Sequence, residues 1–244
     1  MKGVKNFIPD PALILLWTFL VLFGVACSGS DSFQRGKDKP SSYSSIFLKG
    51  EGVLEFKLVD ESLSDDRLRD LVSEVRNKNH ILEGSYDAKT VSEINQALGS
   101  QIPAGTEIAY ELHFDPIDSK KIDKALPLLL VKKAVLTGDS LQSAKVGIKN
   151  SMPYVFLQFN PQGAEDFKVV TGQNISKRLA ILVDGTVYVV PKIESTVPDG
   201  KAQLRFGVGE YQRQFDEADD LVRILRRRYH LEPEKKSWLD RLFH

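Results

Sequence analysis

The fold of this chain is decided by the stretch Arg178-Leu-Ala-Ile-Leu-Val-Asp-Gly-Thr-Val-Tyr-Val-Val-Pro191. Two apolar runs rich in β-branched residues flank Asp184-Gly185, and an Asp-Gly pair in this position is a strong signal for a two-residue hairpin turn. The turn requires a positive φ at both central residues, which Gly185 supplies without steric cost. Both sides of the first run are apolar. We therefore expect an antiparallel hairpin whose first strand is covered on both faces.

Strand and helix patterns extend on both sides of this hairpin. The predicted strands are 46–59 (half-buried), 108–114, 126–131, 145–149, 154–159 and 202–206. Four helices are predicted. The first spans 65–77 with Ser64 as N-cap, and the second spans 88–98 and ends at Gly99. The third begins at Asn160-Pro161, buries Ala164, Phe167 and Val170 and stops near Gly172, and the fourth has an apolar face of Phe215, Ala218, Leu221, Val222 and Leu225. This pattern predicts an α+β protein in which a mostly antiparallel or mixed sheet is packed by helices.

Composition narrows the classes of function. The chain has 33 Lys and Arg against 33 Asp and Glu, so no basic field favours nucleic acid as a partner. A single cysteine excludes an internal disulfide and a cysteine-rich metal site. The four histidines are not paired at ligand spacing, and the sequence holds no zinc-protease, phosphate-loop or dinucleotide motif. We expect no catalytic residue, no metal and no cofactor, hence a protein that is not an enzyme.

The N-terminus reads as a targeting segment. Lys2 and Lys5 precede an apolar run of 15 residues, 12–26, which is shorter than the ~20 residues that a membrane-spanning helix needs. The run ends on Gly24-Val-Ala-Cys27, which resembles a bacterial lipoprotein signal and implies acylation of Cys27. The alternative is a retained N-terminal anchor with an inert thiol. Both tether the chain outside the cytoplasm, with 1–26 as signal peptide and the Ser-, Gly- and Pro-rich segment 27–45 as a disordered linker.

Three stretches around the hairpin resemble the first periplasmic domain of SecD, an accessory subunit of protein export, in order and spacing. They are Val135–Gly147, Pro153–Ala164 and Asn174–Pro191, and further upstream Leu54–Glu61 and Ile102–Glu107 also resemble that domain. The likeness covers about residues 51–226. It implies a base and a protruding head that hold an emerging polypeptide, and it implies no catalytic residue.

The same resemblance suggests how the chain is organised. We expect a partial base-like α/β region at 46–134, a head-like subdomain at 135–213, a closing amphipathic helix at 214–230 and a tail at 231–244. After Leu225, where SecD-like proteins continue into membrane helices, the sequence reads Arg-Arg-Arg-Tyr with no apolar span before His244. Proton-driven translocation is therefore not expected of this chain by itself.

Two exposed features could contact a membrane or a partner. One is the run of Arg226, Arg227 and Arg228, whose alternative is simple solvation at a helix end; the other is the tail with Trp238 and Phe243, whose alternative is packing on its own domain. We expect a lipid-anchored envelope protein that faces the periplasm, on either the inner or the outer membrane. It would bind extended polypeptide or dock on an export or envelope assembly. The alternative is a structural envelope lipoprotein without a client chain, and a hydrolase ranks third.

Overall fold

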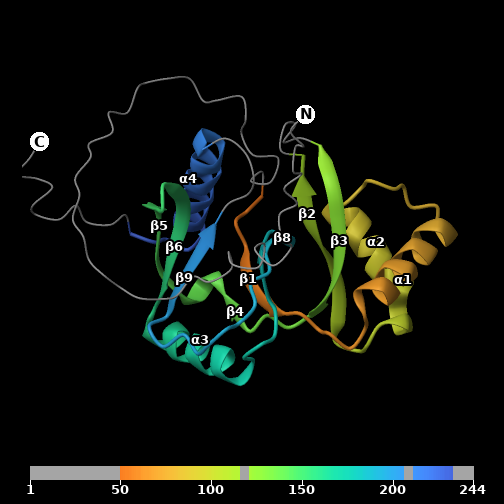
Figure 1. Cartoon of the computed structure of the whole chain (residues 1–244), viewed down its shortest axis with the longest axis horizontal. Helices are drawn as coiled ribbons and strands as arrows, with labels where there is room; N and C mark the ends of the chain where they lie inside the picture. Colours follow the sequence, from red (N-terminus) through yellow and green to blue (C-terminus); the bar gives the residue numbers. More distant parts are fainter. Residues whose placement is uncertain (1–49, 116–120, 206–210, 233–244) are drawn as a thin grey trace, which may run out of the picture. The chain divides into compact units, whose positions relative to one another are not determined.

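The structure, a computed structural model, describes residues 50–115, 121–205 and 211–232 (Figure 1). The predicted hairpin is present and joins β7 (Leu179–Val183) to β8 (Thr186–Val189). Between the two strands, φ is 50° at Asp184 and 76° at Gly185. All five residues of β7 are buried, so this strand is covered on both faces as predicted.

The hairpin lies inside a six-stranded sheet of order β3-β2-β8-β7-β1-β4. Its other strands are β1 (Leu54–Leu58), β2 (Thr106–Phe114), β3 (Ile122–Val131) and β4 (Leu136–Thr137). Every pairing is antiparallel except that of β2 with β8, which is parallel through Glu111 and Val187. The sheet also curls back on itself, because Val59, just after β1, bridges Leu130 of β3.

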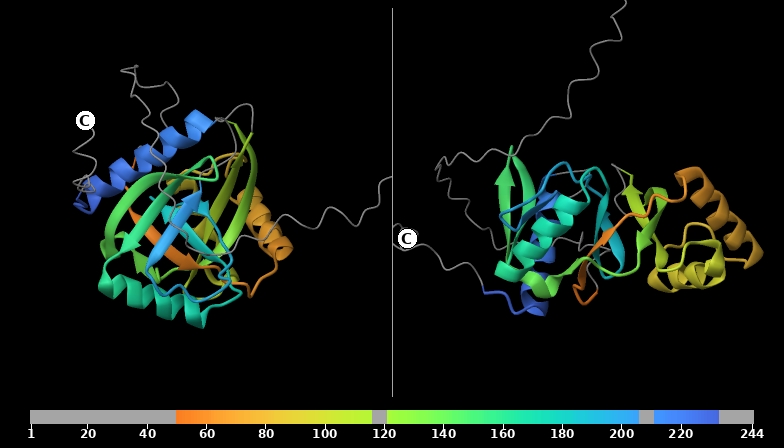
Figure 2. Two further views of the ribbon diagram at one scale, coloured as in Figure 1. Left: turned by 60° about the vertical axis from the view of Figure 1, so that its left-hand side comes forward. Right: turned by 90° about the horizontal axis from the view of Figure 1, so that it is seen from below.

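A second sheet has three antiparallel strands in the order β5-β6-β9. Its strands are β5 (Leu141–Lys149), β6 (Met152–Phe159) and β9 (Lys201–Arg205). Helix α3 (Pro161–Gln173) follows β6, and helix α4 (Tyr211–Arg228) follows β9. β5 and β6 form a hairpin through Asn150 and Ser151, both with positive φ. Helix α4 lies against β5 and β6 (Figure 2).

Capping residues fix where the helices begin. Ser64 accepts a hydrogen bond from the Arg67 N–H at the start of α1 (Asp65–Lys78), and Asn160 accepts one from the Gly163 N–H at the start of α3. Helix α2 (Ala88–Leu98) ends at Gly99 as predicted. Asp87, which was not predicted as an N-cap, caps the start of this helix. Hydrogen bonds from the Ser85 hydroxyl and from Thr90 lower the pKa of the Asp87 carboxyl.

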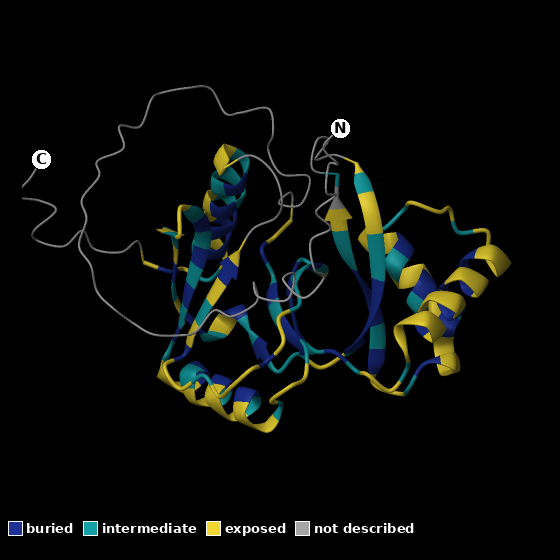
Figure 3. Ribbon diagram, viewed as in Figure 1, coloured by how far each residue is buried: buried dark blue, intermediate teal, exposed yellow. Residues whose placement is uncertain are grey.

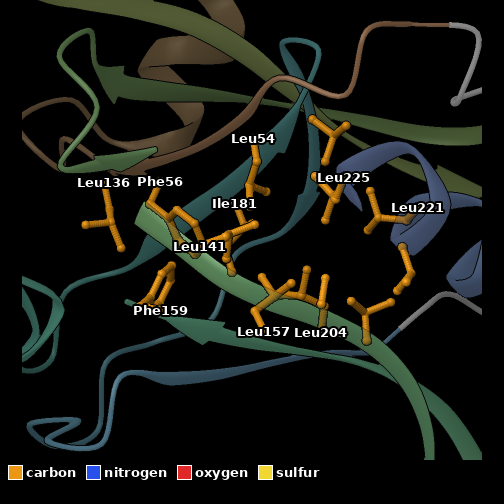
Figure 4. Packing of buried hydrophobic residues seen from close by; sticks show 14 of the residues in the cluster. Leu54, Phe56, Leu136, Leu141, Leu157, Phe159, Ile181, Leu204, Leu221 and Leu225 are labelled. Atoms are coloured by element: carbon orange, nitrogen blue, oxygen red, sulfur yellow. The ribbon is translucent and has the colours of Figure 1, made fainter. Parts of the chain in front are cut away.

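Three apolar clusters hold these elements together. Figure 3 marks the buried residues of the chain in dark blue. In the largest, Phe56 of β1 packs against Phe159 of β6, with ring centroids 5.5 Å apart, and against Phe167 of α3 at 6.1 Å. Figure 4 shows how side chains of β1, β6, β7 and α4 point toward one another there. A second cluster packs α1 and α2 on β2 and β3, and a third fills the concave side of the curled sheet between Ala180, Leu182 and Leu130. The predicted α+β class is confirmed.

Some predicted details were wrong. Within the described residues, the half-buried strand predicted at 46–59 spans only Leu54–Leu58, and both of its faces are covered, since Lys57 is only 7% exposed. The buried face of α3 is formed by Gly163, Phe167 and Thr171, with Val170 only partly buried. The strand predicted at 126–131 begins earlier, at Ile122, so Pro127 lies in the middle of β3, opposite Tyr110. An edge strand accepts proline at this position because the missing N–H need not pair.

The six-stranded sheet draws its strands from both predicted regions. β1, β2 and β3 come from 46–134, and β4, β7 and β8 come from 135–213. The boundaries of these regions, like those of the signal peptide, linker and tail, stay predictions.

Candidate functional site

Asp184 does more than form a turn. Its carboxylate accepts hydrogen bonds from the backbone N–H groups of Gly52 (3.0 Å) and Val53 (2.9 Å), and its own N–H donates to the Val53 carbonyl (2.9 Å). The turn therefore ties the chain that enters β1 to the hairpin that pairs with it. This link stabilises the fold. The sequence predicted the turn at Asp184 but not the hydrogen bonds of its carboxylate to Gly52 and Val53.

The predicted arginine run is divided among three environments. Arg226 Nε donates to the carbonyl oxygen of Ala144 in β5 at 3.0 Å, and Arg228 Nη1 donates to Glu51 Oε2 at 2.8 Å. Arg227 is exposed. Two of the three guanidinium groups thus bind the chain itself, so the run does not present three free cations to a partner. Cys27, Trp238 and Phe243 lie outside the described residues.

A cavity of about 320 Å³ is lined by residues of β2, α2 and the β7–β8 turn, and several of its polar groups are paired within the chain. Lys57 Nζ is 2.9 Å from Glu107 Oε1 and 3.1 Å from Glu55 Oε2. Burial opposes the charge of Lys57, but hydrogen bonds to the two carboxylates outweigh it and raise its pKa. Asn95 of α2 covers the edge of β2, accepting from the Ile108 N–H (2.6 Å) and donating to the Ile108 carbonyl (2.9 Å). These groups stabilise the fold and leave this strand edge closed.

The three-stranded sheet is different because one of its faces belongs to none of the apolar clusters formed by the described residues. Val155, Leu157 and Phe159 of β6 point into the largest cluster, so the alternate side chains of β6 face the other way. The register aligns three rows on that outer face: Lys145, Phe156 and Gln203; Gly147, Tyr154 and Arg205; and Ser143, Gln158 and Lys201. The face is polar and basic, with two half-buried aromatic rings along its middle strand.

On the outer face, the Phe156 ring packs closely against the backbone of Gly147. A Cβ added at Gly147 would lie 2.7 Å from Phe156 Cε2, so a larger residue at this position would displace the ring. Lys149 Nζ donates to Gln203 Oε1 at 2.9 Å and lies 6.0 Å from the centre of the Tyr154 ring. A groove runs over β5 and this face, bordered by Tyr229, His230 and Glu232 of the segment after α4.

The outer edge of β5 borders the same groove. In an antiparallel pair, successive residues turn their backbone groups alternately toward and away from the neighbouring strand. Arg226 binds the Ala144 carbonyl, which therefore points away from β6, and the backbone groups of Val146 and Ile148 point the same way. Within the described ranges no strand pairs with this edge, and Ile148 is 61% exposed. The site is thus an open strand edge beside a basic and aromatic sheet face.

The side chains of the described residues form no group of three or more His, Cys, Asp or Glu that could hold a metal ion. None of the helices in the described ranges combines the length and the apolar character needed to cross a membrane.

The segment that contains the three-stranded sheet is similar to known proteins. Residues 112–227, which span β3 to β9 and nearly all of α4, match the model of the SecDF P1 head subdomain. This segment is similar to the SecDF P1 head subdomain. The resemblance to SecD that the sequence predicts is thereby confirmed for residues 112–227.

Relatives of the SecDF head extend this match. The chain is 34% identical over 132 residues to the protein translocase subunit SecD of Desulfurispirillum indicum, covering 53% of this chain and 24% of that protein. It is 40% identical over 116 residues to SecD of Calditerrivibrio nitroreducens, covering 44% and 22%, and 36% identical over 147 residues to SecDF of Thermus thermophilus, covering 60% and 18%. The chain thus spans about a quarter of the length of these relatives or less.

A solved structure described as "Structure and function of a membrane component SecDF that enhances protein export" aligns with 72% of this chain and 62% of its own, at 26% identity and a TM-score of 0.40. The crystal structure of SecDF in a "Super-membrane-facing form" aligns with 72% of this chain and 19% of its own, at 25% identity and a TM-score of 0.41.

Proposed function

We propose that this chain is a non-enzymatic envelope protein that faces the periplasm, is held by a lipid on Cys27 and uses its SecD-type head to bind extended polypeptide, free or as part of an export or envelope assembly. The observation that carries the proposal is the open outer edge of β5 inside the family-matched segment. A peptide that adds to a strand edge gains main-chain hydrogen bonds that do not depend on its sequence, which suits a protein that must accept many chains.

The geometry sets the strength of such binding. Val146 and Ile148 each offer one N–H and one C=O on the outer edge, while the Ala144 carbonyl is already taken by Arg226. A short edge of this kind supports weak, broad binding, which fits a chain that is to be released. Arg226 therefore sets the limit of the edge rather than forming a contact site of its own.

The alternative is a structural envelope lipoprotein that binds no client. The six-stranded sheet favours it, since Asn95 covers the edge of β2 and Val59 bridges β3. In that reading the β5 edge is simply a strand edge with which no described strand pairs.

The test is a titration of the full chain with a permanently unfolded polypeptide, followed by fluorescence anisotropy at low and high ionic strength. Ile148→Pro removes an N–H from the outer edge without removing a hydrogen bond to β6, and it should abolish binding. Asp123→Pro makes the same change at an exposed position on the outer edge of β3 and should leave binding intact. Absence of binding at every ionic strength would favour the structural alternative, and an equal loss of binding with Asp123→Pro would show that the effect of proline is not specific to the β5 edge.

A further inference from the structure

The groove beside the β5 edge contains apolar surface that the described residues leave open. Ile148 is 61% exposed, which is high for a large apolar side chain, and Phe156 is only half-buried on the outer face. Both residues line the groove, together with Ala202 of β9, and its volume is about 1170 Å³. A groove of this size has room for several large apolar side chains, and removing apolar surface from water on both partners would favour their docking.

The described chain ends at this groove. Residues 229–232, which follow α4, line one side of it. Tyr229 is fixed there because its hydroxyl accepts a hydrogen bond from the Leu54 N–H at 2.9 Å, and the Leu231 N–H donates to the Arg226 carbonyl at 3.0 Å. The sequence that follows position 232 is therefore tethered beside the groove.

That sequence, Pro233-Glu-Lys-Lys-Ser-Trp-Leu-Asp-Arg-Leu-Phe-His244, lies outside the described residues, and its pattern is complementary to the groove. Trp238, Leu239, Leu242 and Phe243 recur at i, i+1, i+4 and i+5, a spacing that would place them on one side of a short helix. From position 232 to Trp238 a chain reaches up to about 20 Å, at ~3.6 Å per residue. Neighbouring strands are about 5 Å apart, so this reach is enough to cross β5 and β6.

We infer that segment 233–244 docks in the groove of its own chain, where its apolar side chains cover Ile148 at the β5 edge and Phe156 on the sheet face. It thereby competes with extended polypeptide for the β5 edge. The docking stands on the groove and on the sequence of the segment, whereas the competition rests on the proposed function. A short tether holds the segment at an effective concentration in the millimolar range, so even a weak contact keeps the groove largely filled.

Two other occupants fit the groove less well. The segment of a second copy has to arrive from dilute solution, without the advantage of a tether. A flat lipid surface meets little of the apolar area, because the Phe156 ring packs against the backbone of Gly147 within a groove that Tyr229 and Glu232 border.

The fluorescence of Trp238 tests the docking in the full chain. The sequence has two tryptophans, so Trp17→Phe leaves Trp238 as the single reporter. In this background the emission should be blue-shifted and protected from acrylamide. Adding Ile148→Ser/Phe156→Ser should shift the emission to the red and increase quenching. Ile148→Ser alone changes an exposed side chain, which spares the core, and should give part of the same shift.

A matched control removes apolar side chains away from the groove. Val169→Ser/Ile175→Ser changes two exposed residues in and after α3, and it should leave the Trp238 emission unchanged. Melting curves of all variants establish that they fold.

The competition is measured by titrating the full chain with unfolded polypeptide, followed by fluorescence anisotropy. Trp238→Ser/Phe243→Ser should bind the polypeptide about threefold more tightly or better, because the groove is no longer filled by the segment. The control Lys235→Ser/Lys236→Ser changes two polar positions of the same segment and should leave the affinity unchanged.

Each contrary outcome has its own meaning. Emission typical of a fully exposed Trp238 would overturn the inference, whatever happens to polypeptide binding. So would a blue shift that survives Ile148→Ser/Phe156→Ser, one that depends on protein concentration, or one that needs vesicles of anionic phospholipid. A docked Trp238 in a chain that binds no polypeptide, even with Trp238→Ser/Phe243→Ser, would remove the proposed function and leave the docking standing. Equal polypeptide affinity with and without that double change would overturn the competition.

Discussion

Replacement of Asp184 separates the two tasks of this residue, which are to adopt a positive φ and to bind the chain that enters β1. Asp184→Ala removes the carboxylate that accepts from Gly52 and Val53, at about 1 kcal/mol for each hydrogen bond at a partly buried site. It also places a residue that disfavours the left-handed region at φ 50°, for about 1 kcal/mol more. We expect the free energy of unfolding to fall by about 3 kcal/mol. At ~2–4 °C per kcal/mol for a domain of this size, thermal unfolding followed by circular dichroism should show a loss of about 6–12 °C.

Two variants divide this effect. Asp184→Asn keeps one acceptor oxygen and tolerates the left-handed region, so it should lower stability by about 1 kcal/mol. Gly185→Ala changes φ preference alone, because an added Cβ meets nothing within 4 Å there, and it should also lower stability by about 1 kcal/mol. If Asp184→Ala is no more destabilising than Gly185→Ala, the hydrogen bonds to the start of β1 contribute nothing and the reasoning fails.

Three further results are expected. Lys57→Met should lower the free energy of unfolding by about 1–3 kcal/mol, because it leaves the Glu107 carboxylate without the buried ammonium group that pairs with it. The pKa of Lys57 is raised above 10.5 in the folded state, so the stability difference from wild type should persist at neutral pH and shrink only as the pH rises through this raised pKa. A stability difference that stays constant across this pH range would show that the pairing is not the cause. Gly138→Ala should lower stability by about 1–3 kcal/mol, because the new Cβ overlaps the Tyr229 ring, and an unchanged melting temperature would contradict this packing. Cys27→Ser should abolish incorporation of labelled palmitate and change electrophoretic mobility, and a wild-type chain that takes up no label would refute acylation.

Local chemistry made much of the fold predictable. The turn at Asp184-Gly185, the capping by Ser64 and Asn160 and the end of α2 at Gly99 depend on a few neighbouring residues, and the structure has each of them where the sequence placed it. Asp87 could have been found by the same rule, since an Asp directly before a helical pattern is a common N-cap.

Features made by distant residues were not predictable. Alternation in 154–159 indicated which side chains point inward, but nothing in it showed that the other face stays outside the apolar clusters. The closure of the six-stranded sheet through Val59 and Leu130 depends on curvature, and the burial of Lys57 depends on the neighbours that this curvature supplies. The basic face needed register across β5, β6 and β9, which a single sequence does not encode in any local pattern.

The order of strands in the six-stranded sheet has a consequence for how the chain acquires its structure. The cluster that packs α1 and α2 on β2 and β3 uses residues from 63 to 129 alone, so it can condense as soon as that segment is available. β1 precedes all of it and pairs with the short strand β4 through Phe56 and Leu136, but its longer pairing is with β7, where Leu54 lies opposite Val183. Because closing so long a loop is slow and synthesis proceeds from the N-terminus, the side of β1 that faces β7 must stay unpaired until the late hairpin exists. The first strand of the sheet is therefore among the last to find its place.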